Sequence, residues 1–259
     1  MNQTKLHQIV DYLATLLEIR DTPDYPQALN GLQFENDGRV TRVAAAVDFS
    51  LATVDAAGEA GADLLLVHHG MFWGGLQPYT GRRRDLLRTL LDGNIAVYSA
   101  HLPLDRHALY GNSVLLAGEL GLQPAGEFAK FKTIHVGVRG ESDLATTQLF
   151  ERAQRFATAH GGTARMSPIS DGHRTRRWAI CTGAGANADT LSEAAELDID
   201  TLIVGEGAHW TAVAAGDTAR AIIYAGHYAT ETLGVQALAT HLSQRFGIAS
   251  TFIAQPTGL

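Results

Sequence analysis

Histidines and carboxylates, the residue types that bind metal ions, stand at the ends of apolar runs in this sequence. Such a run predicts a buried strand, and a strand's end lets a side chain leave the sheet on a rigid backbone. Imidazoles and carboxylates together are the natural ligands of zinc, iron or manganese. The residues are His68 and His69 after DLLLV, His101 and Asp105 in YSAHLPLD, and His227 and Glu231 in IIYAGHYATE. Six such groups exceed what one tetrahedral ion needs, so the sequence indicates a two-metal centre.

His68 and His69 are neighbours, and neighbouring side chains of a strand point to opposite faces. Both can serve one cluster only where that alternation breaks, and Gly70, which follows at once, permits a sharp turn. For the pair alone, the alternative is one buried, hydrogen-bonded histidine and one surface histidine. The other histidine–carboxylate pairs in the sequence favour the metal interpretation.

His101 and Asp105 leave the apolar run NIAVYSA in a turn, because Pro103 cannot donate an ordinary ladder hydrogen bond. The alternative role for Asp105 is to cap the N-terminus of a following helix, for which aspartate is a favoured residue. Capping and metal binding are compatible, and the apolar run before Asp105 is of the same type as the run before His68.

His227 and Glu231 are four residues apart, a spacing that places both side chains on one face of a helix. If Gly226 is the turn between strand and helix, His227 is the first helical residue and both groups face the mouth of the sheet. The alternative is an ordinary histidine–glutamate pair on a helix surface.

Glu206 and His209 follow the apolar run TLIVG, and their spacing predicts that they share one face of a helical turn. We expect them to orient metal-bound imidazoles or to contact substrate.

Three further segments have two interpretations each. GAGAN (183–187) is either a phosphate-binding loop or a simple tight turn. Ala188 stands where the phosphate-binding pattern has its last glycine, which favours the turn. The basic run 82–84 is a solvated face or a contact for substrate phosphates. MFWGG (71–75) is a hydrophobic lid or plain packing of Phe72 and Trp73.

Apolar runs alternate with helical patterns along most of the chain. Near-continuous apolar strands predict an α/β fold of layered sheets with helices on both faces. We expect two interleaved α/β units, the first from residues 1–128 plus 226–259 and the second from 129–225, with a boundary near PAGEFAKFK. Sites of α/β sheets lie at strand carboxyl ends, so the metal site is expected in the cleft between the units.

Composition narrows the function classes. A net charge of −7 argues against a general nucleic-acid-binding surface. Cys181 is the single cysteine, so an internal disulfide is excluded, a cytoplasmic location is expected, and a buried strand position is predicted for the thiol. The N-terminal segment predicts an amphipathic helix rather than a signal peptide, and no apolar run is long enough to span a membrane.

Seven segments, in order along the chain, carry a family resemblance. They are NGLQFE (30–35), AAVDFS (45–50), DLLLVHHGMFWGG (63–75), AHLPLD (100–105), GNSVLLAGELGL (111–122), VGEGAHW (204–210) and AGHYATE (225–231). Together they resemble the Nif-three-like family, whose members are dinuclear-metal proteins commonly named type 2 GTP cyclohydrolase homologues. The match departs within AHLPLD, where the family pattern leads us to expect a threonine or asparagine near Leu102 to Leu104.

The resemblance implies a ligand set. The implied metal ligands are His68, His69, Asp105, His227 and Glu231. Glu231 would bridge two divalent ions per chain, of zinc, iron, manganese or nickel, one ion leaning on His68 and Asp105 and the other on His69 and His227. The residues implied to lie close to the metals are His101, Glu206 and His209. A ring-shaped homohexamer is also implied.

Two functions from different classes follow. The first is a metal-dependent hydrolase, in which ions bridged by Glu231 activate a water and His101, Glu206 or His209 carries the proton. Its substrate is a small molecule: the family name points to a purine nucleotide such as GTP, and a phosphoester fits the same residues. The alternative is a non-catalytic metal-binding, metal-delivery or scaffold protein, which needs the same ligands but no substrate pocket.

Overall fold

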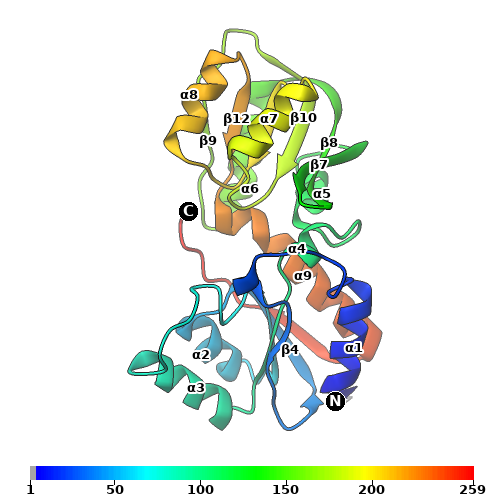
Figure 1. Ribbon diagram of the computed structural model, residues 1–259, viewed down its shortest axis with the longest axis vertical. Helices are drawn as coiled ribbons and strands as arrows, with labels where there is room; N and C mark the ends of the chain where they lie inside the picture. The colour runs from blue at the N-terminus through cyan, green and yellow to red at the C-terminus, as the bar shows by residue number, and fades with distance from the viewer. Residues whose placement is uncertain (1–3) are drawn as a thin grey trace. The chain divides into compact units, whose positions relative to one another are not determined.

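The computed structural model describes residues 4–259 and divides into two compact units (Figure 1). The first unit takes the chain up to His107 together with Gly234–Gln255, and the second takes Ala108–Leu233 with Pro256–Leu259. Both units contain sheets and helices, so the predicted α/β fold of interleaved units is confirmed. The boundaries proposed from the sequence at residues 128/129 and 225/226 stay a prediction.

The elements of the first unit are β1 (Thr4–Lys5), α1 (Leu6–Leu16), a 3-10 turn (Pro26–Ala28), β2 (Gly31–Phe34), β3 (Arg39–Val40), β4 (Arg42–Asp48), α2 (Leu51–Glu59), β5 (Leu64–His69), α3 (Arg82–Asp92), β6 (Ala96–Ser99), α4 (Leu102–Asp105), the later part of α9 (His227–Phe246) and β13 (Ala249–Phe252). The main sheet has the order β13-β4-β5-β6-β2, and β1 pairs separately with β3. Strands β13 to β6 of that order are parallel, whereas β2 runs antiparallel to β6.

Helices cover both faces of this sheet. One face packs Ala46, Val67 and Val97 against Val54 of α2 and Leu90 of α3, all of them fully buried. Helix α1 lies on the opposite side of the sheet from α2 and α3 (Figure 1). It buries Leu6, Ile9 and Leu13 on one face, so the predicted N-terminal amphipathic helix is confirmed. Since β5 is covered on both sides, every residue from Leu64 to His69 is buried.

A carboxylate fixes how β4 and β5 align. Asp63, directly before β5, accepts hydrogen bonds from the backbone N–H groups of Thr41 and Arg42 and from the Thr41 hydroxyl, at 2.7–3.0 Å. These contacts lie at the amino-terminal edge of the sheet and set the register in which Asp48 pairs with His69 at the carboxyl edge.

The elements of the second unit are α5 (Asn112–Glu119), β7 (Gly126–Phe131), β8 (Ile134–Ala145), α6 (Thr146–Ala159), β9 (Arg165–Met166), β10 (Arg174–Cys181), α7 (Ala188–Glu196), β11 (Thr201–Val204), α8 (His209–Asp217), β12 (Ala221–Tyr224) and the first two turns of α9. The sheet has the order β7-β8-β10-β11-β12-β9, with β10, β11 and β12 parallel and the outer strands antiparallel to their neighbours.

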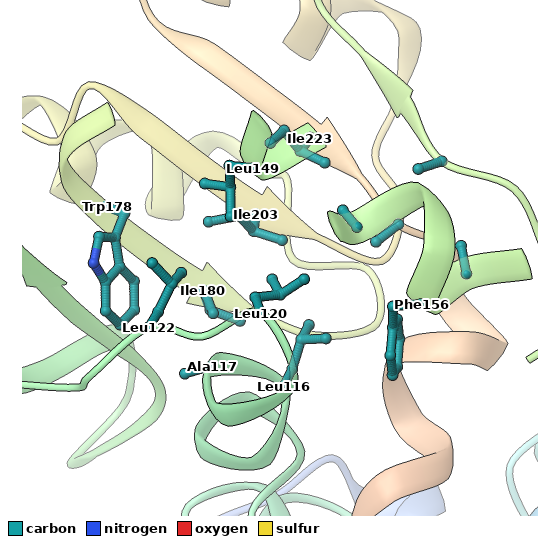
Figure 2. Packing of buried hydrophobic residues seen from close by; sticks show 14 of the residues in the cluster. Leu116, Ala117, Leu120, Leu122, Leu149, Phe156, Trp178, Ile180, Ile203 and Ile223 are labelled. Carbon is teal, nitrogen blue, oxygen red and sulfur yellow. The ribbon is translucent and has the colours of Figure 1, made fainter. Parts of the chain in front are cut away.

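This sheet is also covered on both faces. Figure 2 shows Trp178, Ile180 and Ile203 of the sheet facing leucines of the α5 segment, including Leu116 and Leu120. On the other face Ala179 and Leu202 pack with residues of α7 and α8. Asp200, directly before β11, accepts hydrogen bonds from the backbone N–H groups of Arg176 and Arg177, as Asp63 does in the first unit.

Several sequence predictions can be compared with these elements. Cys181 is a buried strand residue, as predicted. The segment 126–131, which interrupts the predicted pattern, forms β7 and pairs antiparallel with β8. Residues 112–122, placed in the first unit from the sequence, supply core residues to the second. Within residues 4–259, no helix combines the length and the apolar character needed to cross a lipid bilayer.

Adjacent leucines of α3 test the packing of the first unit. Leu90 is fully buried, while Leu91 is 67% exposed. We expect Leu90→Ala to lower the free energy of unfolding by about 2–5 kcal/mol, because it leaves a cavity in the core. The control, Leu91→Ala, should change it by less than about 0.5 kcal/mol. Urea unfolding followed by circular dichroism measures both, and equal losses would contradict the assigned face of α3.

Candidate metal centre

His68 ends the apolar run of β5 and is completely buried. Its ring Nδ1–H donates to the backbone carbonyl of Ala100, at 2.9 Å. A carbonyl oxygen can only accept, so Nδ1 carries a proton and Nε2 is the ring nitrogen left for another partner. That Nε2 lies 3.5 Å from Oδ2 of Asp105. Asp105 is the last residue of the short helix α4, and the N-cap of the next helix is Gly111, so Asp105 does not take the capping role.

His69 is held in the same way by a different element. Its Nδ1 donates to Oδ1 of Asp48 at 2.9 Å, and Asp48 is the last residue of β4, the neighbouring parallel strand. The strand geometry therefore supplies both the histidine and the carboxylate that orients its ring.

His101 is held by a buried carboxylate from a distant loop. Its Nδ1 lies 2.9 Å from Oδ1 of Asp24, and its backbone N–H donates to the amide oxygen of Asn30 at 2.7 Å. Asn30 in turn donates to Asp24, as do the backbone N–H groups of Tyr25 and Leu102. Burial by itself raises the pKa of Asp24, but the hydrogen bonds and the charge of His101 outweigh it, so the pKa lies below its usual value.

These three imidazoles form one cluster. The His68 ring lies 4.9 Å from the His69 ring and 4.8 Å from the His101 ring, between centroids. Ring nitrogens of the three lie within 4.8 Å of one another. The break in strand alternation predicted for the His68–His69 pair is wrong, because β5 continues through His69. Side chains lean along a strand, and the two neighbouring imidazoles at its carboxyl end lie with their ring centres 4.9 Å apart although the strand is unbroken.

The second unit contains another donor set. Gly226 has φ +91 and α9 begins at His227, as predicted for a glycine turn before the helix. Nε2 of His227 lies 3.1 Å from Oε2 of Glu231, one turn later, and Nδ1 lies 2.8 Å from Oε1 of Glu206. Glu231 is buried, with 3% of its surface exposed. Glu206 is therefore the oxygen acceptor that orients His227, which is the role expected for it from the sequence.

Two glycines make room for this second set. A Cβ at Gly183 would collide with Oε1 of Glu231 and lie 3.4 Å from Nε2 of His227. A Cβ at Gly205 would approach the Thr230 hydroxyl to 2.7 Å and Cα of His227 to 2.8 Å. The backbone of both loops thus comes as close to the donors as glycine allows, and Gly183 also has the positive φ of +61 that favours glycine.

His209 belongs to a different helix from His227 and Glu231. It is the first residue of α8 and is exposed, and Glu206 precedes that helix. The prediction that both share one face of a helical turn is wrong, because residues 205–208 form a loop that leads into α8. GAGAN forms a tight turn into α7, in which the Asn187 side chain accepts the N–H groups of Asp189 and Thr190. This capping uses helix-terminal donors that a phosphate would need.

The donors fit a divalent transition metal. In all four histidines Nδ1 is hydrogen-bonded to an oxygen, and this is the arrangement that directs Nε2 toward an ion in metalloproteins. Imidazoles combined with the carboxylates of Asp105 and Glu231 suit zinc, iron, manganese or nickel. The donor chemistry and the glycine cradle around Glu231 therefore agree with a metal site.

Comparison with known proteins places the chain. The model of the Duf34/NIF3 (NGG1p interacting factor 3) family matches residues 4–257. The chain belongs to the Duf34/NIF3 family. A Deinococcus radiodurans member named "GTP cyclohydrolase 1 type 2 homolog" is 38% identical over 258 residues, covering 97% of this chain and 94% of its own. A Pyrococcus abyssi member of the same name is 38% identical over 259 residues, with 97% and 98% covered.

Solved Duf34/NIF3-like structures share the fold. A crystal structure from Thermus thermophilus has 36% identity and a TM-score of 0.85, covering 99% of this chain and 100% of that chain. Protein ybgI, described as of unknown function, has 31% identity and a TM-score of 0.88 with the same coverage. The family resemblance predicted from the motifs is confirmed.

Two of the groups that orient histidines in this Duf34/NIF3 chain, Asp48 and Asp24, were missed in the sequence analysis. Asp48 lies in AAVDFS, at the end of an apolar run, and the reasoning applied to His68 would have found it. Asp24 stands outside every recognised motif and is separated from His101 by 77 residues. Gln33, in NGLQFE, accepts the backbone N–H of Met71 at 2.6 Å and fixes the chain just after the histidine pair.

Gly183 provides a test of the cradle in the Duf34/NIF3 chain. We expect Gly183→Ala to weaken zinc binding and stability together, because the new methyl group displaces the Glu231 carboxylate. Gly172→Ala is the matched control: Gly172 has φ +72, but a Cβ there meets nothing within 4 Å. In the control, the free energy of unfolding should fall by only about 1–2 kcal/mol, the cost of placing alanine in the left-handed region, and zinc affinity should not change. Urea unfolding measures the stability and calorimetric titration measures the zinc affinity. Equal zinc affinity in wild type and Gly183→Ala would show that Gly183 does not make room for Glu231.

The pKa of His227 predicts a pH dependence in the metal-free protein. Burial lowers this pKa, but the hydrogen bonds and charges of Glu231 and Glu206 outweigh it and raise the pKa to about 9 from 6.5. A raised pKa contributes stability that is complete below about pH 6.5 and is lost as pH rises through about 9. In EDTA, the stability gap between wild type and His227→Gln should therefore narrow from pH 6 to pH 10. The exposed control His7→Gln should show no such trend, and a gap that widened with pH would contradict the assignment.

Proposed function

We propose that this protein is a metal-dependent hydrolase of small molecules with a dinuclear centre. The observation that carries the proposal is the set of imidazoles held by oxygen acceptors through Nδ1, three of them clustered in the first unit. Such orientation is needed to place ring nitrogens on an ion, and four independent examples are difficult to explain by packing alone.

The proposal assigns both donor sets to one centre. His68, His69 and Asp105 of the first unit and His227 and Glu231 of the second would hold the ions, with the Glu231 carboxylate shared between them as the family resemblance implies. Two ions with open positions for water and substrate need more protein ligands than either unit supplies alone. The joint centre is part of the proposal and rests on this donor number.

Divalent ions at such a centre lower the pKa of coordinated water toward neutrality and offset negative charge that develops on a substrate oxygen. The chain's own residues supply proton transfer and orientation. We assign proton transfer to His101, because Asp24 holds its Nδ1 and so leaves Nε2 for exchange with a substrate or a water. Glu206 and Asp48 fix the rings of His227 and His69. His227 must lose the Nε2 proton it shares with Glu231 before it can ligate an ion.

The relatives named "GTP cyclohydrolase 1 type 2 homolog" make a purine nucleotide the first substrate to assay, with phosphoesters second. Metal identity among zinc, iron, manganese and nickel, a hexameric ring and a cytoplasmic location are held as proposals from the sequence. His209 is exposed at the start of α8, and its part in proton transfer stays a proposal from the sequence.

Glu231→Gln tests the hydrolase directly. We expect the variant to lose bound metal and turnover together, because an amide is a poorer bridge between two cations than a carboxylate. Metal per chain is measured by mass spectrometry, and turnover on GTP and a phosphoester panel after reconstitution with each metal. The control is Glu196→Gln, at an exposed position of α7 in the same unit.

The outcomes separate the two function classes. About two ions per wild-type chain with turnover that Glu231→Gln abolishes would support the hydrolase. Turnover that persists in metal-free Glu231→Gln protein would refute it. Two bound ions with no turnover on any substrate would favour the non-catalytic metal-binding or metal-delivery protein instead.

A further inference from the structure

A cavity of about 270 Å³ lies beside His69, and all of its lining residues belong to the first unit. Aromatic and apolar side chains form most of its wall, among them Phe49, Met71, Trp73 and Tyr79. Asp48 also lines it, and its carboxylate accepts the hydrogen bond from His69. The cavity therefore joins a candidate metal ligand to a space whose wall is part aromatic and apolar and part charged.

Trp73 forms an aromatic wall next to the donors. Its indole ring lies 4.5 Å from the His69 ring with a tilt of 32°, and 4.5 Å from the His101 ring with a tilt of 60°. The residue comes from MFWGG, which the sequence left open between a lid and plain packing. Met71 and Phe72 of that segment pack in the core, whereas Trp73 faces the imidazoles and the cavity. A planar ring bound in the cavity could stack against it.

Arg83 brings a permanent positive charge to the same cavity. Its guanidinium lies 5.2 Å above the centre of the Tyr79 ring and donates to the side-chain oxygen of Gln77. These contacts hold the guanidinium in place and use only part of its five N–H donors. Its neighbours in the basic run differ: Arg82 is exposed, and Arg84 is exposed and pairs with Asp85 at 2.7 Å.

We propose that this cavity binds a small aromatic anion, with its ring against Trp73 and its carboxylate or phosphate on Arg83, beside His69. A planar guanidinium is the side chain best matched to either anion, because it can donate two parallel hydrogen bonds. The volume is just below the range of about 300–1,000 Å³ typical of drug-sized ligands, which suits one ring or a fused pair inside the cavity. The inference rests on the proposed hydrolase function, since it names the class of group presented to that centre.

The test is a binding measurement that needs neither metal nor turnover. Phenyl phosphate is titrated calorimetrically into the full-length protein stripped of metal with EDTA, alongside phenol and inorganic phosphate. We expect phenyl phosphate to bind more tightly than either fragment. Arg83→Gln should weaken its binding at least about tenfold, the size expected for losing charged hydrogen bonds. Arg84→Gln, the adjacent exposed arginine, should leave the affinity unchanged.

Arg83→Lys is the second variant, since it keeps the charge but loses the planar fork, and its affinity should fall between those of wild type and Arg83→Gln. Equal affinity for phenyl phosphate and inorganic phosphate, or equal affinity in wild type and both Arg83 variants, would overturn the cavity assignment. Such a result alongside metal-dependent turnover would leave the hydrolase standing. Binding that depends on Arg83 in a protein without turnover would uphold the cavity and refute the hydrolase.

Discussion

The candidate centre depends on the hydrogen bonds that Nδ1 makes to a fixed oxygen in His68, His69, His101 and His227. The acceptors are the carbonyl of Ala100 and the carboxylates of Asp48, Asp24 and Glu206, which come from four different segments of the chain. Each bond selects one tautomer and one ring orientation, so the cost of ordering the side chain is met during folding rather than when an ion binds. It also helps to explain why buried imidazoles are tolerated at strand ends, since the Nδ1 atom of each has a hydrogen-bond partner.

The two units reach similar sites by similar local means. In the first unit, Asp63 before β5 binds the backbone at the start of β4, so it aligns the two parallel strands of β4–α2–β5. In the second unit, Asp200 before β11 does the same for β10–α7–β11. In both, the helix between the strands starts at a side-chain cap, Ser50 in one and Asn187 in the other. The amino-terminal edge of each sheet thus carries structural carboxylates, and the carboxyl edge carries the histidines and their partners. Stability and chemistry occupy opposite ends of the same strands, as is usual for parallel sheets.

Sequence reasoning succeeded where a residue's role depends on its own segment. The run DLLLVHH had to be a buried strand, and Gly226 before His227 had to be a turn into a helix, because local patterns decide both. It failed where the role depends on a distant segment. Strand β2 (GLQF) is short and lies at a sheet edge, and it forms only because β6 offers a partner more than sixty residues later. Asp24 is likewise an ordinary loop aspartate until folding brings His101 to it. His209 was misplaced because an i,i+3 spacing was interpreted as helical before a helix had begun.

The anchoring of β5 by Asp63 means that a residue far from the candidate site controls its histidines. A slip of one residue between β4 and β5 would turn His68 and His69 to each other's faces, because side-chain direction alternates along a strand. Asp63 opposes that slip from about 20 Å away, the rise of six strand residues. A substitution at Asp63 would therefore disturb the candidate ligands His68 and His69 although both histidines remain in the sequence.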